Sequence, residues 1–201
     1  MSAESSIPQD SLALLSIEDT VVFPNNTIPF HIFEPHYKSM IADCLDKHGY
    51  LCFATEVARK EERHEHRLFH RTGCLLKVID YHKLSNQNYE VLLECICPVT
   101  ITEIASNKPY QIVDFEIIEQ FNTDLDPEQK KHLQANFLSH ISQRISDEDL
   151  QKITPKIQAM PSKELINAMA YNCPASTETR QELLETHDLE ALIERLGDYY
   201  F

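Results

Sequence analysis

The amino-acid sequence predicts an α+β protein in which a β-rich half precedes an all-helical half. Up to residue 120 the apolar residues form strand-like runs, which one helical segment interrupts. After residue 122 the hydrophobic period changes to that of helices. The predicted organisation is a polar, disordered N-terminus at residues 1–10, a β-barrel subdomain at residues 11–122 and a helical bundle at residues 123–201.

The first half opens with a short apolar strand at residues 12–15. The stretch at residues 23–37 holds three prolines, which fix φ and remove backbone donors, so we expect an irregular path there rather than a sheet interior. Pro35 suits the first turn of a helix, predicted at residues 34–47, and Gly49 suits a left-handed cap after it. The apolar face of this helix comprises Tyr37, Met40, Ile41, Cys44 and Leu45.

Four further strands are predicted from β-branched and apolar runs, at residues 51–57, 74–84, 89–104 and 112–118. The polar insert at residues 85–88 predicts a hairpin turn between the second and third of them, because asparagine tolerates a positive φ. In the fourth, strict alternation predicts that Val113, Phe115 and Ile117 face inward.

The second half is predicted to contain five helices. Pro127 suits the first turn of the first helix, whose apolar residues recur at helical spacing. Ser176 and Asp188 are candidate N-caps of the last two helices, because their side-chain oxygens can accept bonds from the first turn. The predicted helical stretches are residues 127–145, 147–153, 162–170, 177–186 and 189–196.

The acidic composition narrows the classes of partner. The formal net charge of −14 repels phosphate backbones and anionic membranes, which disfavours nucleic acid and membrane surfaces. No apolar run approaches the roughly 18 residues of a membrane-spanning helix. The first residues lack the features of a signal peptide. Six cysteines without a secretory signal are therefore expected to be reduced, mostly buried thiols of a cytoplasmic protein.

The proline-rich stretch also carries a family signature. Residues 23–37 read FPNNTIPFHIFEPHY, which resembles the pattern F-P-x-x-x-x-P-L-x-I-F-E-x-R-Y of the Lon amino-terminal, substrate-binding domain family. Other segments resemble that family in the same order, so the resemblance covers about residues 12–199. These segments are residues 37–45, 72–78, 161–170 and 179–192.

This resemblance implies a fold and a role. Family members have a PUA-like pseudo-barrel followed by a helical bundle, and in full-length Lon proteases this unit helps to engage substrates. The sequence holds no G-x-x-x-x-G-K-[ST] phosphate loop, so the resemblance implies a stand-alone, ATP-independent and non-catalytic binding module without a cofactor. The implied partners are unfolded or exposed protein segments, or one dedicated protein partner.

Three parts of the sequence depart from the family pattern, and one of them is residues 94–99, which replace the family's R-G-x-x-R-F and so lack its arginines and glycine. Asn25 stands where the family commonly has glycine, and we expect it to adopt the left-handed turn that this position requires. His36 replaces the arginine that usually precedes the tyrosine of the motif, which removes a fixed cation.

Aromatic residues are the candidate peptide-contacting or partner-contacting residues. The rings of the proline-rich stretch either pack the irregular segment onto the barrel or line a groove for extended apolar peptides. The junction between barrel and helices is a second candidate cleft, towards which Phe121 would lead. The candidate contact residues are Phe30, Phe33, Tyr37 and Phe121.

Two alternative functions stay open. A PUA-like barrel also occurs in RNA-related proteins, but that function predicts a basic stripe, which this sequence lacks. A small-ligand or metal-binding regulator would use His64, His66 and His70 as metal ligands. Because these histidines fall in the charged segment at residues 59–70, which supplies no rigid frame, a solvated loop is the preferred interpretation.

Overall fold

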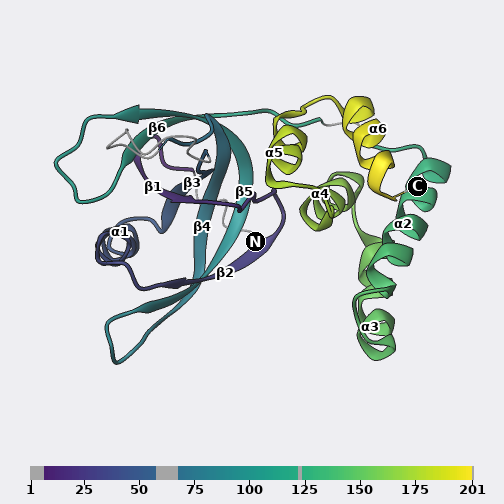
Figure 1. Ribbon diagram of the computed structural model, residues 1–201, viewed down its shortest axis with the longest axis horizontal. Coiled ribbons are helices and arrows are strands. Elements are labelled where there is room, and N and C mark those ends of the chain that lie inside the picture. The colour runs from purple at the N-terminus through teal and green to yellow at the C-terminus, as the bar shows by residue number, and fades with distance from the viewer. Residues whose placement is uncertain (1–6, 58–67, 122–123, 201) are drawn as a thin grey trace. The chain divides into compact units, whose positions relative to one another are not determined.

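The computed structural model describes residues 7–57, 68–121 and 124–200 (Figure 1). Within them the chain is α+β, with a six-stranded sheet and six helices, and it divides into two compact units, residues 1–118 and 119–201. The first six residues of the predicted disordered tail lie outside the described residues. The same is true of most of the charged segment, residues 59–67.

The sheet of the first unit closes on itself. Its strands, in chain order, are β1 Leu12–Ile17, β2 Thr27–Ile32, β3 Tyr50–Thr55, β4 Thr72–Lys83, β5 Tyr89–Ile104 and β6 Ile112–Ile117. They are hydrogen-bonded in the order β2-β5-β4-β3-β1-β6, and β6 also pairs with β5. Five strands therefore form a closed barrel, on which β2 is an additional strand. Among these described strands, β1 and β3 pair in parallel and all other pairs are antiparallel.

The long strand β5 makes this closure possible. Residues 89–94 of β5 pair with β2, and residues 99–104 pair with β6. Along its other side β5 pairs with β4. There Leu75 pairs with Cys97 and the next residue, Leu76, pairs with Cys95, so the register shifts by one residue. The extra residue, Ile96, is a β-bulge, which bends and twists a strand. Figure 1 shows β5 curving along the barrel.

Apolar side chains fill the barrel. Buried residues of β1, β3, β4, β5 and β6 form one cluster: Leu12, Leu14, Tyr50, Cys52, Ala54, Leu75, Val99, Ile101 and Val113.

Burial raises the pKa of the Cys44 thiol, on the first helix, to about 12. This thiol is therefore neutral at physiological pH and packs as a small apolar side chain.

The proline-rich stretch differs from its prediction, because residues 27–32 form the strand β2. β2 stands at one end of the strand order, and among the described strands it pairs with β5 alone. An edge strand needs hydrogen bonds on one side alone, so it tolerates Pro29, which has no N–H to donate. The prediction of an irregular path was wrong here because the proline rule applies to strands that are paired on both sides.

The turn residues agree with their predictions in part. Helix α1, Pro35–Leu45, starts with Pro35 in its first turn, and Gly49 has φ +74° and donates its N–H to the Cys44 carbonyl. Asn25 has φ +64°, as predicted. In the β4–β5 turn, however, Gln87 and not an asparagine takes the positive φ. Ile117 is 49% exposed rather than inward, because it ends β6 at the margin of the sheet.

The second unit contains five helices within the described residues: α2 Pro127–Ser142, α3 Asp147–Ala159, α4 Ser162–Asn172, α5 Thr177–Glu185 and α6 Leu189–Tyr200. The side chains of Ser176 and Asp188 accept N–H bonds in the first turns of α5 and α6. The predicted end of α3 was residue 153, but the helix continues to Ala159 and includes Pro155. No helix of the described chain has both the length and the apolar character to cross a bilayer.

A tyrosine of the last helix organises the core of this unit. The buried Tyr200 hydroxyl donates to the Met169 carbonyl at 2.7 Å. Its ring meets those of Phe137 and His140 edge-on, with centroids 6.0 and 4.9 Å away. Burial lowers the pKa of His140, and Arg144 adds to this effect. The Nε2 atom of His140 is buried without a hydrogen-bond partner among the described residues.

We expect Gly73→Ala to destabilise the barrel by about 3 kcal/mol or more, since overpacking at a backbone atom cannot relax. The new Cβ would lie 2.0 Å from the Phe53 carbonyl oxygen and 2.7 Å from Ile101 Cδ1. Gly49→Ala is the control: its Cβ meets nothing closer than 3.8 Å, so only the left-handed φ costs roughly 1–2 kcal/mol. Urea unfolding compares the two. Equal costs would contradict the close approach at Gly73.

The second unit is expected to lose stability as pH falls below 6.5, the ordinary pKa of histidine. The folded-state pKa of His140 is lowered, so the unfolded chain binds this proton first, and acidification favours unfolding. Helix content followed by circular dichroism in urea, at neutral pH and at about pH 5, measures this change. His140→Gln should show a smaller loss than the parent chain. An identical pH dependence in both proteins would contradict the prediction.

Candidate functional site

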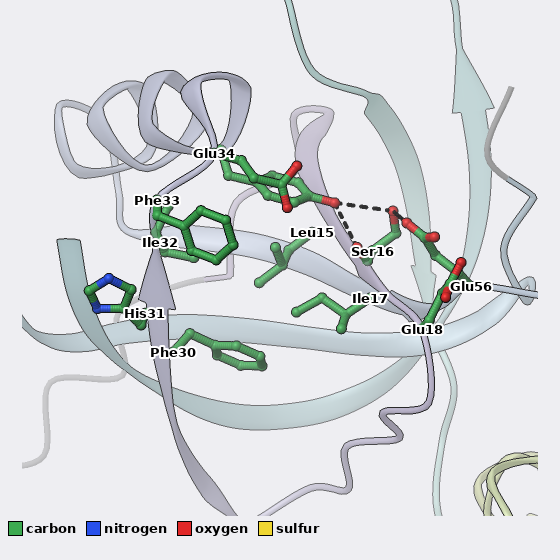
Figure 2. Close-up of a pocket in the computed structure, with 11 residues that line it drawn as sticks. Leu15, Ser16, Ile17, Glu18, Phe30, His31, Ile32, Phe33, Glu34 and Glu56 are labelled. Atoms are coloured by element: carbon green, nitrogen blue, oxygen red, sulfur yellow. Dashed lines mark hydrogen bonds between the residues drawn. The ribbon is translucent and has the colours of Figure 1, made fainter. Parts of the chain in front are cut away.

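A pocket of about 550 Å³ opens where β1, β2 and α1 meet (Figure 2). Leu15 and Ile17 of β1 supply apolar walls, and Phe30 and Phe33 project from β2 and from the residue that follows it. Figure 2 shows both rings directed towards Leu15 and Ile17. We call this cavity the β1–β2 pocket; its lining is completed by Ser16, Glu18, His31, Ile32, Glu34, Tyr37 and Glu56.

The local sequence explains why a large ring is exposed here. Ile28 and Ile32 are the buried residues of β2, and Phe30 is half-buried with its ring 6.0 Å from that of Phe53. Phe33 comes directly after the strand, and Pro35 then begins α1. Because the strand has ended and the helix has not yet begun, the Phe33 side chain is not covered by either element and stays 60% exposed.

Hydrogen bonds hold the back of the pocket. The Tyr37 hydroxyl, buried at the start of α1, donates to the Ser16 carbonyl at 2.6 Å. The Ser16 hydroxyl donates in turn to Glu56 Oε1 at 2.9 Å. α1, β1 and the residue after β3 are thereby connected through Ser16, which fixes the position of the Glu56 carboxylate.

A second set of contacts fixes the position of α1. Asp43 on this helix accepts hydrogen bonds from Lys108 Nζ at 2.6 Å and from the Tyr110 hydroxyl, both in the segment between β5 and β6. These two donors lower the pKa of Asp43, so its carboxylate stays charged at neutral pH. Helix α1 is therefore attached to the barrel near both of its ends, through Tyr37 and through Asp43.

Three carboxylates give the pocket its charge. They belong to Glu18, Glu34 and Glu56, and the described part of the lining contains no lysine or arginine. His36 Nε2 lies 3.6 Å from Glu34 Oε2. The ring of His31 stacks on that of Phe33, with centroids 6.2 Å apart. The arrangement combines an aromatic wall, an apolar floor and anionic groups, which suits binding of an amphipathic chain segment.

A neighbouring pocket of about 470 Å³ continues the surface across β2. It shares Phe30 and His31 with the β1–β2 pocket and extends to β4 and β5. Tyr81, 53% exposed, lines it together with Asp80 and Glu90. An extended segment lying across β2 would therefore meet aromatic and acidic side chains in both pockets.

The structure brings three of the four predicted contact residues together. Phe30, Phe33 and Tyr37, which the sequence analysis selected as part of an aromatic cluster, all line the β1–β2 pocket. Phe121 lies in the second unit, is half-buried and is not part of this lining. Sequence reasoning missed Ser16 and Glu56, whose only local signal is a polar residue at the end of an apolar strand.

The metal candidates do not form a describable site. His64 and His66 lie outside the described residues. His70 is half-buried, and its backbone N–H donates to the Thr55 carbonyl at 3.0 Å. Over residues 7–57, 68–121 and 124–200, no group of three or more histidine, cysteine, aspartate or glutamate side chains is placed to hold a metal ion.

The chain is similar to known proteins over nearly its whole length. Residues 11–199 match the family model of the ATP-dependent protease La (LON) substrate-binding domain. The Lon protease of Koribacter versatilis is 25% identical over 195 residues, and that of Rickettsia prowazekii is 26% identical over 191 residues. These alignments cover 94% and 87% of this chain, which spans only 24% of either relative.

Solved structures show the same fold. The N-terminal domain of Mycobacterium avium complex Lon protease superposes with a TM-score of 0.72 at 16% identity, covering 95% of this chain and 98% of that one. A Lon N-terminal domain protein from Xanthomonas campestris gives a TM-score of 0.68, also at 16% identity, with 96% and 99% covered. At such low identity the likeness concerns the fold alone.

Removing the Tyr37 hydroxyl, which connects α1 to β1 at the pocket, is expected to destabilise the first unit. Tyr37→Phe deletes the buried bond to the Ser16 carbonyl, which costs about 1–2 kcal/mol of unfolding free energy. Tyr81→Phe is the matched control, because the same atom is removed from an exposed side chain. Urea denaturation monitored by tyrosine fluorescence measures both. Equal stabilities of the two variants would contradict this role of Tyr37.

Proposed function

The chain belongs to the ATP-dependent protease La (LON) substrate-binding domain family, and we propose that it binds exposed segments of proteins in the β1–β2 pocket without catalysing a reaction on them. Phe30, Phe33 and Tyr37 are the proposed contact residues. Support comes from the family match, which concerns a substrate-binding domain and extends over residues 11–199. The role of Phe121 at a second cleft stays a prediction.

The exposure of Phe33 is the observation that carries this proposal. A phenylalanine that is 60% exposed beside a 550 Å³ pocket leaves much apolar surface in water. Covering such a ring is favourable by about 25 cal/mol per Å² of apolar area, so a bound segment gains free energy by packing on it. Aromatic anchors next to pockets are the usual energetic centres of protein interfaces.

The dimensions of the site favour a short stretch of polypeptide. Ligand pockets commonly measure about 300–1,000 Å³, and the β1–β2 pocket and its neighbour fall within this range. Pro29 removes one backbone donor from the edge strand β2, which weakens recognition by addition of a full strand. Side-chain pockets are therefore proposed to provide most of the recognition.

Two further features belong to the same proposal. The closed barrel of the first unit is proposed to be of the PUA-like type that the sequence motif implies, with β2 as an additional edge strand. A reducing compartment, the cytoplasm, is the proposed location. All six cysteines are free thiols, which is the usual state of cysteines there.

We expect Phe33→Ala to weaken peptide binding by roughly tenfold or more, the usual effect of truncating a central aromatic anchor. The measurement is fluorescence anisotropy of short labelled peptides from unfolded proteins, titrated with the purified chain at low and at moderate salt. Because Phe33 is largely exposed, the variant should keep the circular dichroism spectrum and stability of the parent chain.

Ile79→Ala serves as the matched control. Ile79 is 46% exposed on β4 and does not line the β1–β2 pocket, so its truncation should leave peptide affinity unchanged. Equal losses in both variants would show that binding does not depend on this pocket. Absence of saturable binding to every peptide would contradict the proposed recognition of exposed protein segments.

A further inference from the structure

We propose that the β1–β2 pocket selects segments in which a lysine or arginine is flanked by apolar residues. This inference rests on the proposed function and adds the chemistry of the preferred segment. It follows from the way in which apolar and anionic groups are arranged around one cavity.

The pocket has two unlike sides. Figure 2 shows the rings of Phe30 and Phe33 on one side and the carboxylates of Glu18 and Glu56 on the other, with Leu15 and Ile17 between them. A side chain that enters along the rings passes over apolar surface first and reaches the carboxylates at its end. Lysine and arginine have this construction, an aliphatic stem with a cationic head.

The aromatic side also favours a cation. The face of a phenylalanine ring attracts an ammonium or guanidinium group within about 6 Å of its centroid. Phe33 is exposed enough to offer such a face. A segment with apolar residues beside the basic one could cover the rest of the ring and the walls formed by Leu15 and Ile17.

A purely apolar occupant is disfavoured by the same lining. It would remove water from the exposed Glu18 carboxylate without replacing the lost hydrogen bonds, which costs free energy. The Ser16 hydroxyl bond holds Glu56 in place, so this carboxylate cannot simply turn away. A cationic head replaces the lost water with charge-assisted hydrogen bonds.

The other polar groups of the described residues around the pocket include no lysine or arginine in the lining. His36 lies beside Glu34, and His31 stacks on Phe33 with its ring directed away from the pocket in Figure 2. Across β2, Asp80 and Glu90 add two more carboxylates in the neighbouring pocket, and His82 also lines it. The net charge of −14 further favours the approach of a basic segment.

The test compares labelled peptides that differ at one position only. An apolar peptide carries lysine, norleucine or glutamate at its centre; norleucine has nearly the same shape as the lysine stem but no charge. Anisotropy titrations near neutral pH should rank the affinities as lysine above norleucine above glutamate. We expect about a fivefold difference between the first two, since partly exposed ion pairs contribute modestly. The difference should shrink as salt is added.

Charge-neutralising variants locate the effect. Glu56→Gln and Glu18→Gln should each reduce the preference for lysine over norleucine, because the lysine ammonium loses an anionic partner while norleucine loses none, and the double variant should abolish the preference. Glu116→Gln is the matched control, because it removes the same charge from an exposed position on β6 outside the pocket. The preference must survive in this control.

The outcomes separate this inference from the proposed function. If norleucine binds as tightly as lysine, and both lose affinity in Phe33→Ala, the pocket binds peptides but the preference for basic residues is wrong. A lysine preference that persists in the double glutamine variant would also overturn the inference. If no peptide binds, or binding ignores Phe33→Ala, the proposed function itself fails.

Discussion

Closure of the sheet on β5 is the constraint on which the rest of the first unit depends. One strand of 16 residues pairs with β4 on one side and with both β2 and β6 on the other. The bulge at Ile96 allows the strand to bend between these partners. Because the second half of β5 closes the barrel with β6, its first half is left to hold β2 as an edge strand.

The position of the candidate site follows from that arrangement. β2 is anchored by β5 along its length, but it ends at Ile32, and the chain must then turn into α1. Phe33 occupies this turn beside the end of β1, while the Tyr37 hydroxyl ties α1 back to the Ser16 carbonyl. The pocket is thus the space between an edge strand and a helix that are both fixed to the barrel. A rigid frame of this kind can present an exposed ring without collapsing onto it.

The pocket combines apolar side chains with carboxylates, which make different demands on a ligand. Strand ends near the barrel rim carry polar residues such as Ser16, Glu18 and Glu56, whereas the turn after β2 carries aromatic ones. In a solvated surface these groups would be independent of one another. Here they share one cavity, so any occupant must satisfy apolar surface and carboxylates at once. Selectivity in binding sites commonly arises from such mixed demands, since the wrong ligand leaves polar groups unpaired.

The elements with local signals could be predicted from the sequence. Pro35 at the start of α1, the left-handed Gly49 and Asn25, and the caps Ser176 and Asp188 depend on backbone sterics and hydrogen bonds within a few residues. The helical period of the second half has the same local origin. The family signature within residues 23–37 supported the same fold class, because members of one family share a fold.

Tertiary pairing decided the features that the sequence left open or misdirected. Residues 27–32 became a strand because β5 offers them a partner, and Pro29 is tolerated because no strand of the described residues pairs with the opposite edge of β2. Gln87 rather than an asparagine took the positive φ, since the register of β4 and β5 determines which residue occupies that turn position. The sequence by itself determined the fold class, the positions at which the helices start and the aromatic cluster. Only the tertiary structure placed Ser16, Glu18 and Glu56 beside those rings, because strand pairing between residues distant in sequence has no local signature.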